Sequence, residues 1–440
     1  MLETMITTST TTASHTPRRR RVAATAASLA VVGALLGMAA CSSDNDGSAA
    51  AETVAEASAP RRETPPPAPP TSPDRVPPTT AAPPTTAAPP TTAAPRQPEP
   101  TSSPDSARQA QLAAILTEHH AAGEFVGARI AVRTADGAFT EASGGTPTLD
   151  PASGPIDPDV PWNIGSATKT FVATVVLQLA DEGRIDLDTG IDRYVPYLPG
   201  ADRITPRQLL NHTSGLGEYL DQPATRAEPK RQWTPAEQVA IAEAAGRVGE
   251  PGGPHHYSNT NYIVLGDIIE QVTGRPWADE VQARIAGPLG MTHTGLTGTP
   301  VPGFAPGDGT LVDVTNAFDP SIGGAAGALQ STSRDLLIFA KALADGTLVS
   351  PESQAAMRTF LPAEDLSRFG IDHGYGLGIE RYVMDGMTVI GHMGTGEIGS
   401  SYVGYDAETG TTVAVTTNTA IAGPAGLMAI EALTAARAAG

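Results

Sequence analysis

The amino-acid sequence predicts a mixed α and β fold (α+β) in one large globular domain. Apolar residues recur at helical spacing over residues 171–179 and 263–272, whereas residues 128–133 and 411–417 form short runs typical of β-strands. A content of 40% hydrophobic residues is enough for a sizeable core, and a net charge of -19 argues against nucleic acid or an anionic membrane face as a partner. Because the chain has one cysteine, a disulfide framework, a zinc finger and a thiol protease are excluded for the globular part.

Residues 1–41 are predicted to be an export signal that ends in a lipid attachment site. Arg18–Arg21 is a basic region, and residues 22–40 are uncharged and end in small residues directly before Cys41. The run Met38-Ala39-Ala40-Cys41 resembles a bacterial lipobox, which implies a lipoprotein signal peptide and lipidation of Cys41. An uncleaved transmembrane anchor is the alternative, because about 20 apolar residues can span a bilayer. Either interpretation places the rest of the chain outside the cytoplasm, held at a bacterial cell membrane.

Residues 42–106 are predicted to be a disordered linker. Of the 40 prolines, 17 fall between Pro60 and Pro104, and the unit Pro-Pro-Thr-Thr-Ala-Ala occurs three times from Pro77 onward. Proline fixes φ and lacks an amide donor, so this composition favours extended polyproline II without a packed core. A spacer through a cell wall and a passive or glycosylated stalk both fit this composition.

The globular domain is predicted to span residues 107–440 and to begin with a helix and a hairpin. Helical spacing covers residues 107–121. Two strand-like runs, 128–133 and 139–142, are separated by Asp136-Gly137, a typical hairpin turn.

A candidate nucleophile follows this hairpin. The run from Asn163 to Lys169 leads into an apolar helix that is expected to stop near Gly183, so Ser166 lies at a helix N-terminus. Lys169 lies one turn further on the same face, which brings its amine within reach of the serine hydroxyl. This is the geometry of the Ser-x-x-Lys motif, although a serine N-cap with a solvated lysine has the same spacing.

The lysine content favours the catalytic interpretation of this motif. The chain has three lysines and 25 arginines, and only Lys169 has a serine three residues before it. Lysine can lose its proton when it is buried, whereas arginine cannot. Gly-x-Ser-x-Gly, the nucleophile motif of the α/β-hydrolases, does not occur in the sequence.

Two later segments complete a recognisable order of motifs. A polar loop with Tyr257 and Asn259 enters an apolar helix, and a strand near residues 388–390 runs into His392 and Gly394. With Ser-x-x-Lys, Tyr-x-Asn and His-x-Gly in this order, the chain resembles the penicillin-recognising serine hydrolases. The resemblance is greatest to the branch of class C β-lactamases, D-alanyl-D-alanine carboxypeptidases and related esterases. It extends from about residue 107 to the C-terminus and includes Leu209–Leu216, Pro288–Met291 and Tyr375–Gly378.

The resemblance implies a β-lactamase/transpeptidase-like arrangement. The N-terminal hairpin and strands near residues 388–390, 401–405 and 411–417 would pair in one antiparallel sheet flanked by helices. Residues 186–291 would form most of a helical lobe, and Ser166 would lie at the cleft between the two parts.

The same resemblance implies an acyl-enzyme mechanism. Ser166 would attack a carbonyl carbon, and Lys169 or Tyr257 would act as the initial base, a choice that the sequence leaves open. Tyr257, acidified by the neighbouring ammonium group, would relay the proton to the leaving group. The backbone N–H groups of Ser166 and Thr395 would hold the oxyanion, because Gly394 lets the strand approach closely.

The remaining predicted site residues are Asn259 and His392. Asn259 would hydrogen-bond a substrate amide, and His392 takes the place where many relatives have lysine, so its imidazole would stabilise the hydroxyl relay. The pairs His119-His120 and His255-His256 lack the spacing of metal ligands, and His-Glu-x-x-His does not occur. We therefore expect no metal and no cofactor.

The substrate is expected to be a small molecule or a peptidoglycan-like compound. Carboxypeptidases of this branch often have an arginine directly after Tyr-Gly-Leu-Gly-x, but this chain has Glu380 there and Arg381 next. A shift of one residue on a strand reverses the side chain, so either a bulge restores Arg381 or the carboxylate clamp is absent. This departure favours an esterase or amidase over a D,D-peptidase.

A non-catalytic cell-wall-binding lipoprotein that uses the same cleft is the second functional hypothesis. A protein of that kind would be expected to have lost Ser166, Lys169 or Tyr257, and all three are present. Catalysis is therefore favoured.

Overall fold

The computed structural model describes residues 104–296 and 298–439. The predicted export signal, Cys41 and nearly all of the predicted linker lie outside the described residues. The first described helix, α2 (Pro104–Ala121), begins three residues before the predicted start of the globular domain. Within the described ranges, no helix is both long and apolar enough to cross a membrane.

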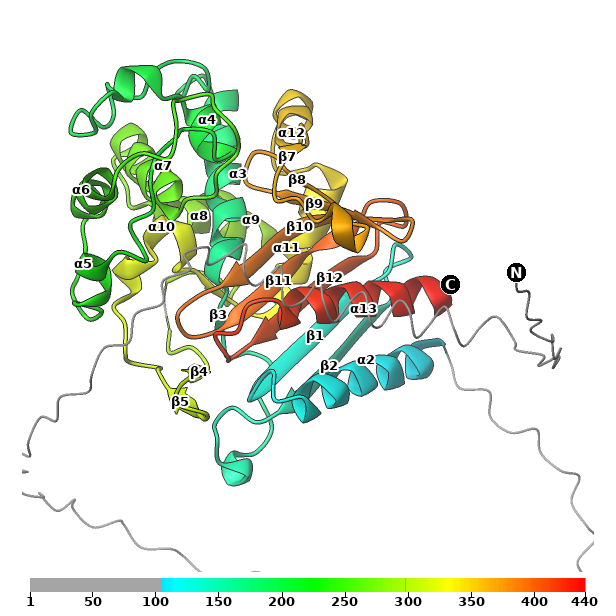
Figure 1. Ribbon diagram of the computed structural model, residues 1–440. Coiled ribbons are helices and arrows are strands. Elements are labelled where there is room, and N and C mark those ends of the chain that lie inside the picture. Colours follow the sequence, from blue (N-terminus) through cyan, green and yellow to red (C-terminus); the bar gives the residue numbers. More distant parts are fainter. Residues whose placement is uncertain (1–103, 297, 440) are drawn as a thin grey trace, which may run out of the picture. The chain divides into compact units, whose positions relative to one another are not determined.

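An antiparallel sheet of eight strands forms the centre of the described part (Figure 1), which confirms the predicted α+β fold. Its strand order is β2-β1-β12-β11-β10-β9-β8-β7. The strands are β1 (Gly127–Arg133), β2 (Phe139–Gly145), β7 (Leu361–Pro362), β8 (Asp372–Tyr375), β9 (Glu380–Met384), β10 (Met387–Thr395), β11 (Ser400–Asp406) and β12 (Thr412–Thr417). Two small sheets pair β3 (Trp162–Asn163) with β6 (Gln330–Ser331), and β4 (Phe304–Pro306) with β5 (Leu311–Asp313).

The predicted N-terminal hairpin is present, and a second hairpin joins two strands near the C-terminus. Strands β1 and β2 pair in antiparallel register, and Gly137 turns the chain between them with φ of 91°. Strands β11 and β12 are joined by a turn in which Gly410 N–H donates to the Asp406 carbonyl at 2.9 Å. In this turn Gly410 has φ of 70°, a conformation that glycine adopts without steric cost.

Helices cover both faces of the sheet. The α-helices, in addition to α2, are α3 (Thr168–Asp181), α4 (Pro206–Leu210), α5 (Pro223–Arg226), α6 (Pro235–Ala245), α7 (Asn259–Thr273), α8 (Trp277–Val281), α9 (Gly287–Leu289), α10 (Gly324–Gly327), α11 (Ser333–Asp345), α12 (Pro351–Met357) and α13 (Pro424–Ala439). Short 3-10 helices are η1 (Pro151–Ser153), η2 (Gly165–Ala167), η3 (Ala201–Arg203), η5 (Pro320–Ile322) and η6 (Ser367–Phe369), and η4 (Gln282–Ala286) is a π-helical turn. Figure 1 shows α2 and α13 together on one face, while α4 to α8 gather in a lobe away from them.

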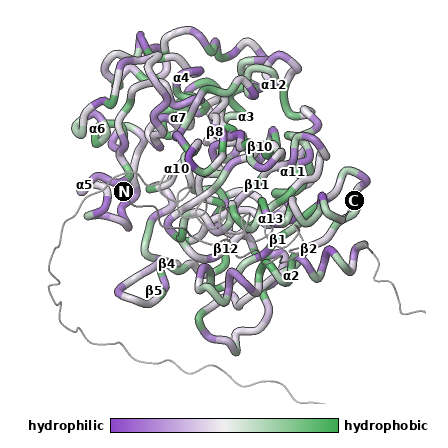
Figure 2. Tube along the Cα trace, turned by 45° about the vertical axis from the view of Figure 1, so that its right-hand side comes forward, coloured by the Kyte–Doolittle hydropathy of each residue, from purple (hydrophilic) through white to green (hydrophobic). Residues whose placement is uncertain are grey.

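The core follows the alternation of side chains along the strands. Ile130 and Val132 pack with Leu116 of α2 and Met428 of α13, whereas Ala131, between them, belongs to the core on the opposite face with α3 and α11. Figure 2 shows the hydrophobic residues of the strands and of α13 gathered in the interior of the domain. Ile164 and Ala167, which flank Ser166, belong to the core formed with α3 and α11.

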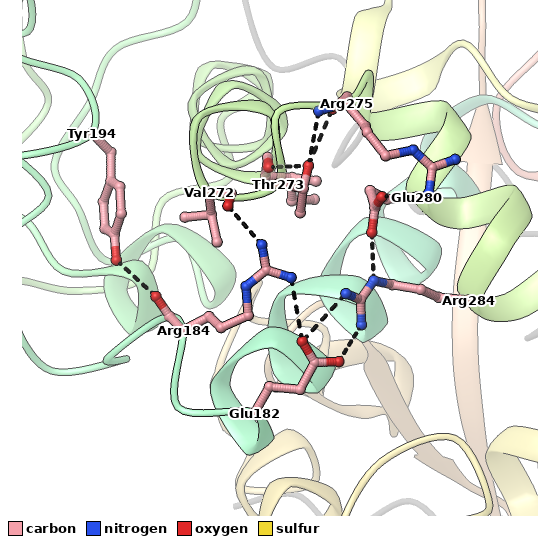
Figure 3. Close-up of polar contacts among 9 residues, drawn as sticks. Glu182, Arg184, Tyr194, Val272, Thr273, Arg275, Glu280 and Arg284 are labelled. Atoms are coloured by element: carbon pink, nitrogen blue, oxygen red, sulfur yellow. Dashed lines mark hydrogen bonds and ion pairs between the residues drawn. The ribbon is translucent and has the colours of Figure 1, made fainter.

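A polar network fixes the ends of the lobe helices (Figure 3). Glu182, just after α3, pairs with Arg284 of η4, and Arg284 also pairs with Glu280 of α8. Arg184 donates to the Val272 carbonyl of α7 at 2.7 Å. The network ties the helix that carries Lys169 to the two helices that pack beside it.

Candidate active site

Ser166 and Lys169 lie together at the start of α3. Ser166 belongs to the η2 turn that runs directly into this helix, and it is partly exposed between the buried residues Gly165 and Ala167. Lys169 Nζ donates to Ser166 Oγ at 2.9 Å. The helical spacing that the sequence predicted therefore brings the amine to the hydroxyl.

Lys169 is completely buried and makes its hydrogen bonds to neutral acceptors. Besides Ser166, its Nζ donates to Asn259 Oδ1 at 2.7 Å and to the Ala326 carbonyl at 2.8 Å. Burial lowers the pKa of Lys169 to about 7, although the negative charges of Glu218 and Glu380 act to raise it. Near neutral pH a substantial share of Lys169 is therefore unprotonated and able to accept the Ser166 proton.

Tyr257 reaches the same hydroxyl from the loop before α7. A hydrogen bond joins Tyr257 to Ser166, and Lys169 Nζ lies 5.0 Å from the centre of the tyrosine ring. Burial raises the pKa of Tyr257 well above its ordinary value, and the hydrogen bond with Ser166 offsets only part of this effect. The expectation of an acidified phenol is thus wrong for this arrangement, in which Tyr257 keeps its proton.

Asn259 begins α7 and holds the lysine. Its Oδ1 accepts from Lys169, while its Nδ2 and backbone N–H donate to Glu218 Oε2 at 3.1 and 2.7 Å. Glu218 was not predicted as a site residue, although it comes only two residues after the Leu209–Leu216 motif. Asn259 therefore has an internal role in addition to the substrate contact predicted from the sequence.

The end of β10 lies directly against the Ser166 turn. A Cβ atom on Gly394 would lie 1.9 Å from the Ile164 carbonyl oxygen, and one on Gly165 would lie 2.5 Å from the Thr395 carbonyl carbon. Gly165 also has φ of 51°, in the left-handed region. Glycines at these two positions bring the backbone of Thr395 beside that of Ser166, the two predicted oxyanion donors.

His392 is buried on β10 and faces Tyr375. Its Nε2 lies 2.9 Å from the Tyr375 hydroxyl, and its Nδ1 lies 2.6 Å from the Met393 carbonyl oxygen. Burial lowers the pKa of His392, so the neutral ring donates from Nδ1 and accepts at Nε2. The Tyr375 ring in turn packs edge-on to Tyr257, with ring centres 6.0 Å apart. The structure thus connects His392 to Tyr257 through Tyr375, a residue that the sequence reasoning placed in a motif but not in the site.

No bulge restores Arg381 to the predicted clamp position. Strand β9 pairs in unbroken register with both neighbours, and Arg381 lies opposite Gly374 on β8 and Ile390 on β10. Its Nη2 donates to Asp372 at 2.8 Å. Glu380 accepts the Met393 N–H at 3.0 Å. Of the two alternatives left by the sequence, the structure favours an absent carboxylate clamp.

The remaining histidine pairs do not form a metal site. Within the described ranges, no group of three or more His, Cys, Asp or Glu is arranged to hold a metal ion. His119 instead lies between Glu124 and Glu431, on the face of the sheet covered by α2 and α13. His255 packs beside Tyr375, with ring centres 5.3 Å apart.

The chain is similar to several known proteins in sequence and fold. The beta-lactamase family matches residues 112–437. A D-stereospecific amidohydrolase from Streptomyces sp. is 33% identical with a TM-score of 0.65, over 74% of this chain and 98% of that one. A D-amino acid amidase from Ochrobactrum anthropi SV3, solved with L-phenylalanine amide, is 30% identical with a TM-score of 0.68, over 75% of this chain and 99% of that one.

A curated relative from Bacillus subtilis (strain 168), PbpX, bears a name that assigns it to the penicillin-binding proteins. It is 30% identical over 208 residues, which are 46% of this chain and 51% of that protein. The chain thus spans about half the length of this relative, whereas it covers nearly all of the two amidohydrolase structures. With the family match over most of the described residues and the same fold in both structures, the chain belongs to the beta-lactamase family of serine hydrolases.

Proposed function

We propose that the protein is an extracytoplasmic amidase or esterase that forms an acyl-enzyme at Ser166. The observation that carries this proposal is the 2.9 Å contact between Ser166 Oγ and Lys169 Nζ, whose buried amine has a pKa of about 7. An amine in this state removes the proton that makes a serine hydroxyl unreactive. A surface lysine with an ordinary pKa would not.

Each group has a defined task in the proposed reaction. Neutral Lys169 takes the proton of Ser166 as Oγ attacks the carbonyl carbon, and the N–H groups of Ser166 and Thr395 hold the oxyanion. Tyr257 gives its proton to the departing amine or alcohol and receives one from Lys169. Water then attacks the acyl-enzyme and releases the acid, which restores the hydroxyl of Ser166.

The substrate class follows from the absent clamp and from the relatives. Because Arg381 is bound to Asp372, this arginine does not act as the carboxylate clamp, which favours amides and esters over carboxypeptidase substrates. The two solved relatives are named for action on D-configured compounds. We therefore propose amides or esters of D-amino acids as substrates, with β-lactams as compounds that acylate the same serine.

Acylation can be measured directly. Purified protein should release a burst of p-nitrophenol from an activated p-nitrophenyl ester, and mass spectrometry should place the adduct of a β-lactam on Ser166. D-phenylalanine amide should be hydrolysed faster than its L-enantiomer. Ser166→Ala should lose the burst and the adduct while keeping its far-UV circular dichroism. A wild-type protein without burst, adduct or turnover would instead support the cell-wall-binding hypothesis.

We also propose that the protein is anchored to the cell membrane through a lipid on Cys41. The support is the basic region, the apolar run and the position of the single cysteine in the sequence. Cys41→Ser should move the protein from the membrane fraction to the medium or periplasm. Retention in the membrane fraction would favour an uncleaved transmembrane anchor.

A further inference from the structure

The loop that carries Tyr257 is held by a buried histidine, His212, which takes no part in the proposed proton transfers. His212 follows α4 after one residue, is 1% exposed and has φ of 58°. This left-handed conformation is uncommon for a residue with a side chain, although histidine adopts it more readily than most. Such a conformation persists where the surroundings determine it, so the place of the imidazole is fixed by its contacts.

Two hydrogen bonds of His212 bracket the tyrosine. Its carbonyl oxygen accepts from His256 N–H at 2.8 Å, and its Nδ1 accepts from Ser258 N–H at 3.2 Å. These donors are the residues directly before and after Tyr257. Nδ1 lies 2.9 Å from Asn261 Nδ2 on the first turn of α7. One residue thus ties the backbone on both sides of Tyr257 to the helix that follows it.

The imidazole also fixes the plane of the phenol. The rings of His212 and Tyr257 stack with centres 4.3 Å apart and planes 30° apart. Tyr375 packs edge-on against the same imidazole at 4.8 Å, so the ring cannot tilt freely. Since Nδ1 accepts from two N–H groups, the proton of the ring lies on Nε2, and burial lowers the pKa of His212 well below its ordinary value. The ring therefore supplies orientation without adding a charge beside Lys169.

We propose that His212 is a positioning residue that sets the angle and distance at which the Tyr257 hydroxyl meets Ser166 and the leaving group. This inference rests on the proposed function, in which Tyr257 protonates that group. An amine leaves an amide only when it is protonated, whereas p-nitrophenolate leaves an ester as a stable anion. Misplacement of Tyr257 should therefore slow amide hydrolysis and largely spare hydrolysis of the activated ester.

The test uses His212→Phe, which keeps a flat ring and removes the Nδ1 acceptor. Rates on D-phenylalanine amide and on a p-nitrophenyl ester are divided by the burst-active fraction, so that loss of folded protein does not enter. We expect the ratio of amide to ester kcat/KM, which reports acylation for both substrates, to fall about 10- to 100-fold, because small misplacements of reacting groups have effects of this size. KM should change little. His293→Phe, the same substitution at an exposed histidine, should keep the wild-type ratio.

Tyr257→Phe, measured in parallel, distinguishes a failure of the proposed role of His212 from a failure of the proposed function. If it lowers the ratio and His212→Phe does not, the role of His212 is overturned while the proposed function stands. If Tyr257→Phe itself leaves the ratio unchanged, the proposed proton relay and the role of His212 both fail.

A second pair of variants applies if His212→Phe shows no burst. Asparagine accepts hydrogen bonds and tolerates the left-handed conformation, so His212→Asn should keep a higher ratio than His212→Ala. Equal ratios in the two variants would overturn the proposal.

Discussion

At Lys169, the protonation state follows from burial. Its three hydrogen-bond acceptors are a hydroxyl, an amide oxygen and a backbone carbonyl oxygen, none of which carries a negative charge. The negative charges of Glu218 and Glu380 raise the pKa of Lys169 without an ion pair to its amine, and they only partly offset the lowering by burial. The site therefore has a base that is available at neutral pH.

The first prediction concerns the pH dependence of acylation. Lys169 has a lowered pKa of about 7, so its amine is charged at lower pH and neutral at higher pH. Because only the neutral amine can accept a proton, kcat/KM should rise about tenfold per pH unit below pH 7 and become constant above it. A pH profile on a p-nitrophenyl ester without an ionisable group measures this, with Lys341→Ala, at a partly exposed lysine outside the site, as control. A profile that is flat from about pH 5 to 8 would contradict the assignment of Lys169 as base.

The second prediction separates His392 from this titration. Since burial lowers the pKa of His392, its ring is already neutral where Lys169 titrates. His392→Gln should lower the rate, because the Tyr375 hydroxyl loses its hydrogen bond with the imidazole. The variant should keep the fall of kcat/KM below about pH 7, because that fall comes from Lys169. If kcat/KM of this variant no longer fell below pH 7, the ionisation that controls the rate would be that of His392.

The residues of the site differ in how far the sequence reveals them. Ser166 and Lys169 are three positions apart, so helical geometry alone predicts their contact. Glu218, His212 and Tyr375 come from loops and a strand more than 30 residues from Ser166 and Lys169, and only tertiary packing brings them together. Periodicity carries no information on such contacts, which is why these three were not predicted as site residues.

At the scale of elements, the approach of β10 to the η2 turn determines where Thr395 lies relative to Ser166. The two elements touch through glycines, and Ser401 Oγ donates to the Ile164 carbonyl at 2.7 Å across the same junction. The position of Thr395 relative to Ser166 is thus set by backbone packing. A side chain at this junction would displace one element from the other.

The third prediction tests this junction. Gly165→Ala places a methyl group 2.5 Å from the Thr395 carbonyl carbon at φ of 51°. We expect acylation to fall at least 100-fold with far-UV circular dichroism preserved, since both oxyanion donors move. Gly309→Ala offers a control with positive φ and open space around the new methyl group. Acylation at the wild-type rate in Gly165→Ala would show that the junction tolerates displacement.

The fourth prediction concerns the packing of α3 against α11. Phe171 and Phe339 stack with ring centres 3.7 Å apart, and both are fully buried. Phe339→Ala should lower the free energy of unfolding by about 3–5 kcal/mol through lost burial and the cavity left behind. Denaturant titration measures the change, and Phe139→Ala at an exposed position should cost far less. A loss below about 1 kcal/mol in Phe339→Ala would mean that the core refills the space.

The elements themselves were predicted unevenly. The helix at 107–121 and the strands near 128–133, 401–405 and 411–417 match α2, β1, β11 and β12, because hydrophobic spacing is clear in each. Strands β7, β8 and β9 were not predicted, since they are short and contain proline, glycine and charged residues. Their pairing depends on the neighbouring strand β10 more than on their own composition.

For the whole molecule, the two ends of the described chain are joined on one face. His119, near the end of α2, lies between Glu124 and Glu431 of α13, at 3.1 Å from the latter. Burial acts to lower the pKa of His119, but the hydrogen bonds with Glu431 and Glu124 outweigh it and raise the pKa. The two carboxylates thus favour the protonated imidazole, which links α2 to α13.

The fifth prediction is the pH dependence of this link. A raised pKa in the folded state gives stability that is present below the unfolded pKa and is lost as pH rises through the folded pKa. His119→Gln should thus lower the free energy of unfolding more at about pH 5 than at about pH 8. Denaturant titrations at both values measure this, with the exposed His120→Gln as control. An equal loss at both pH values would show that His119 acts without its charge.

The position of β12 between β1 and β11 has a consequence for the order in which the protein can fold. Val126 N–H donates to Thr419 Oγ1 at 3.0 Å, although the two residues are 293 positions apart in the sequence. Strand β1 pairs with β12 on one side, so this pairing cannot form before β12 has been made. Contacts of such sequence separation slow folding, because a long loop must close first. During synthesis, Ser166 and Lys169 emerge long before the sheet that supports them can close, so hydrolytic activity should appear only after β12 has been made.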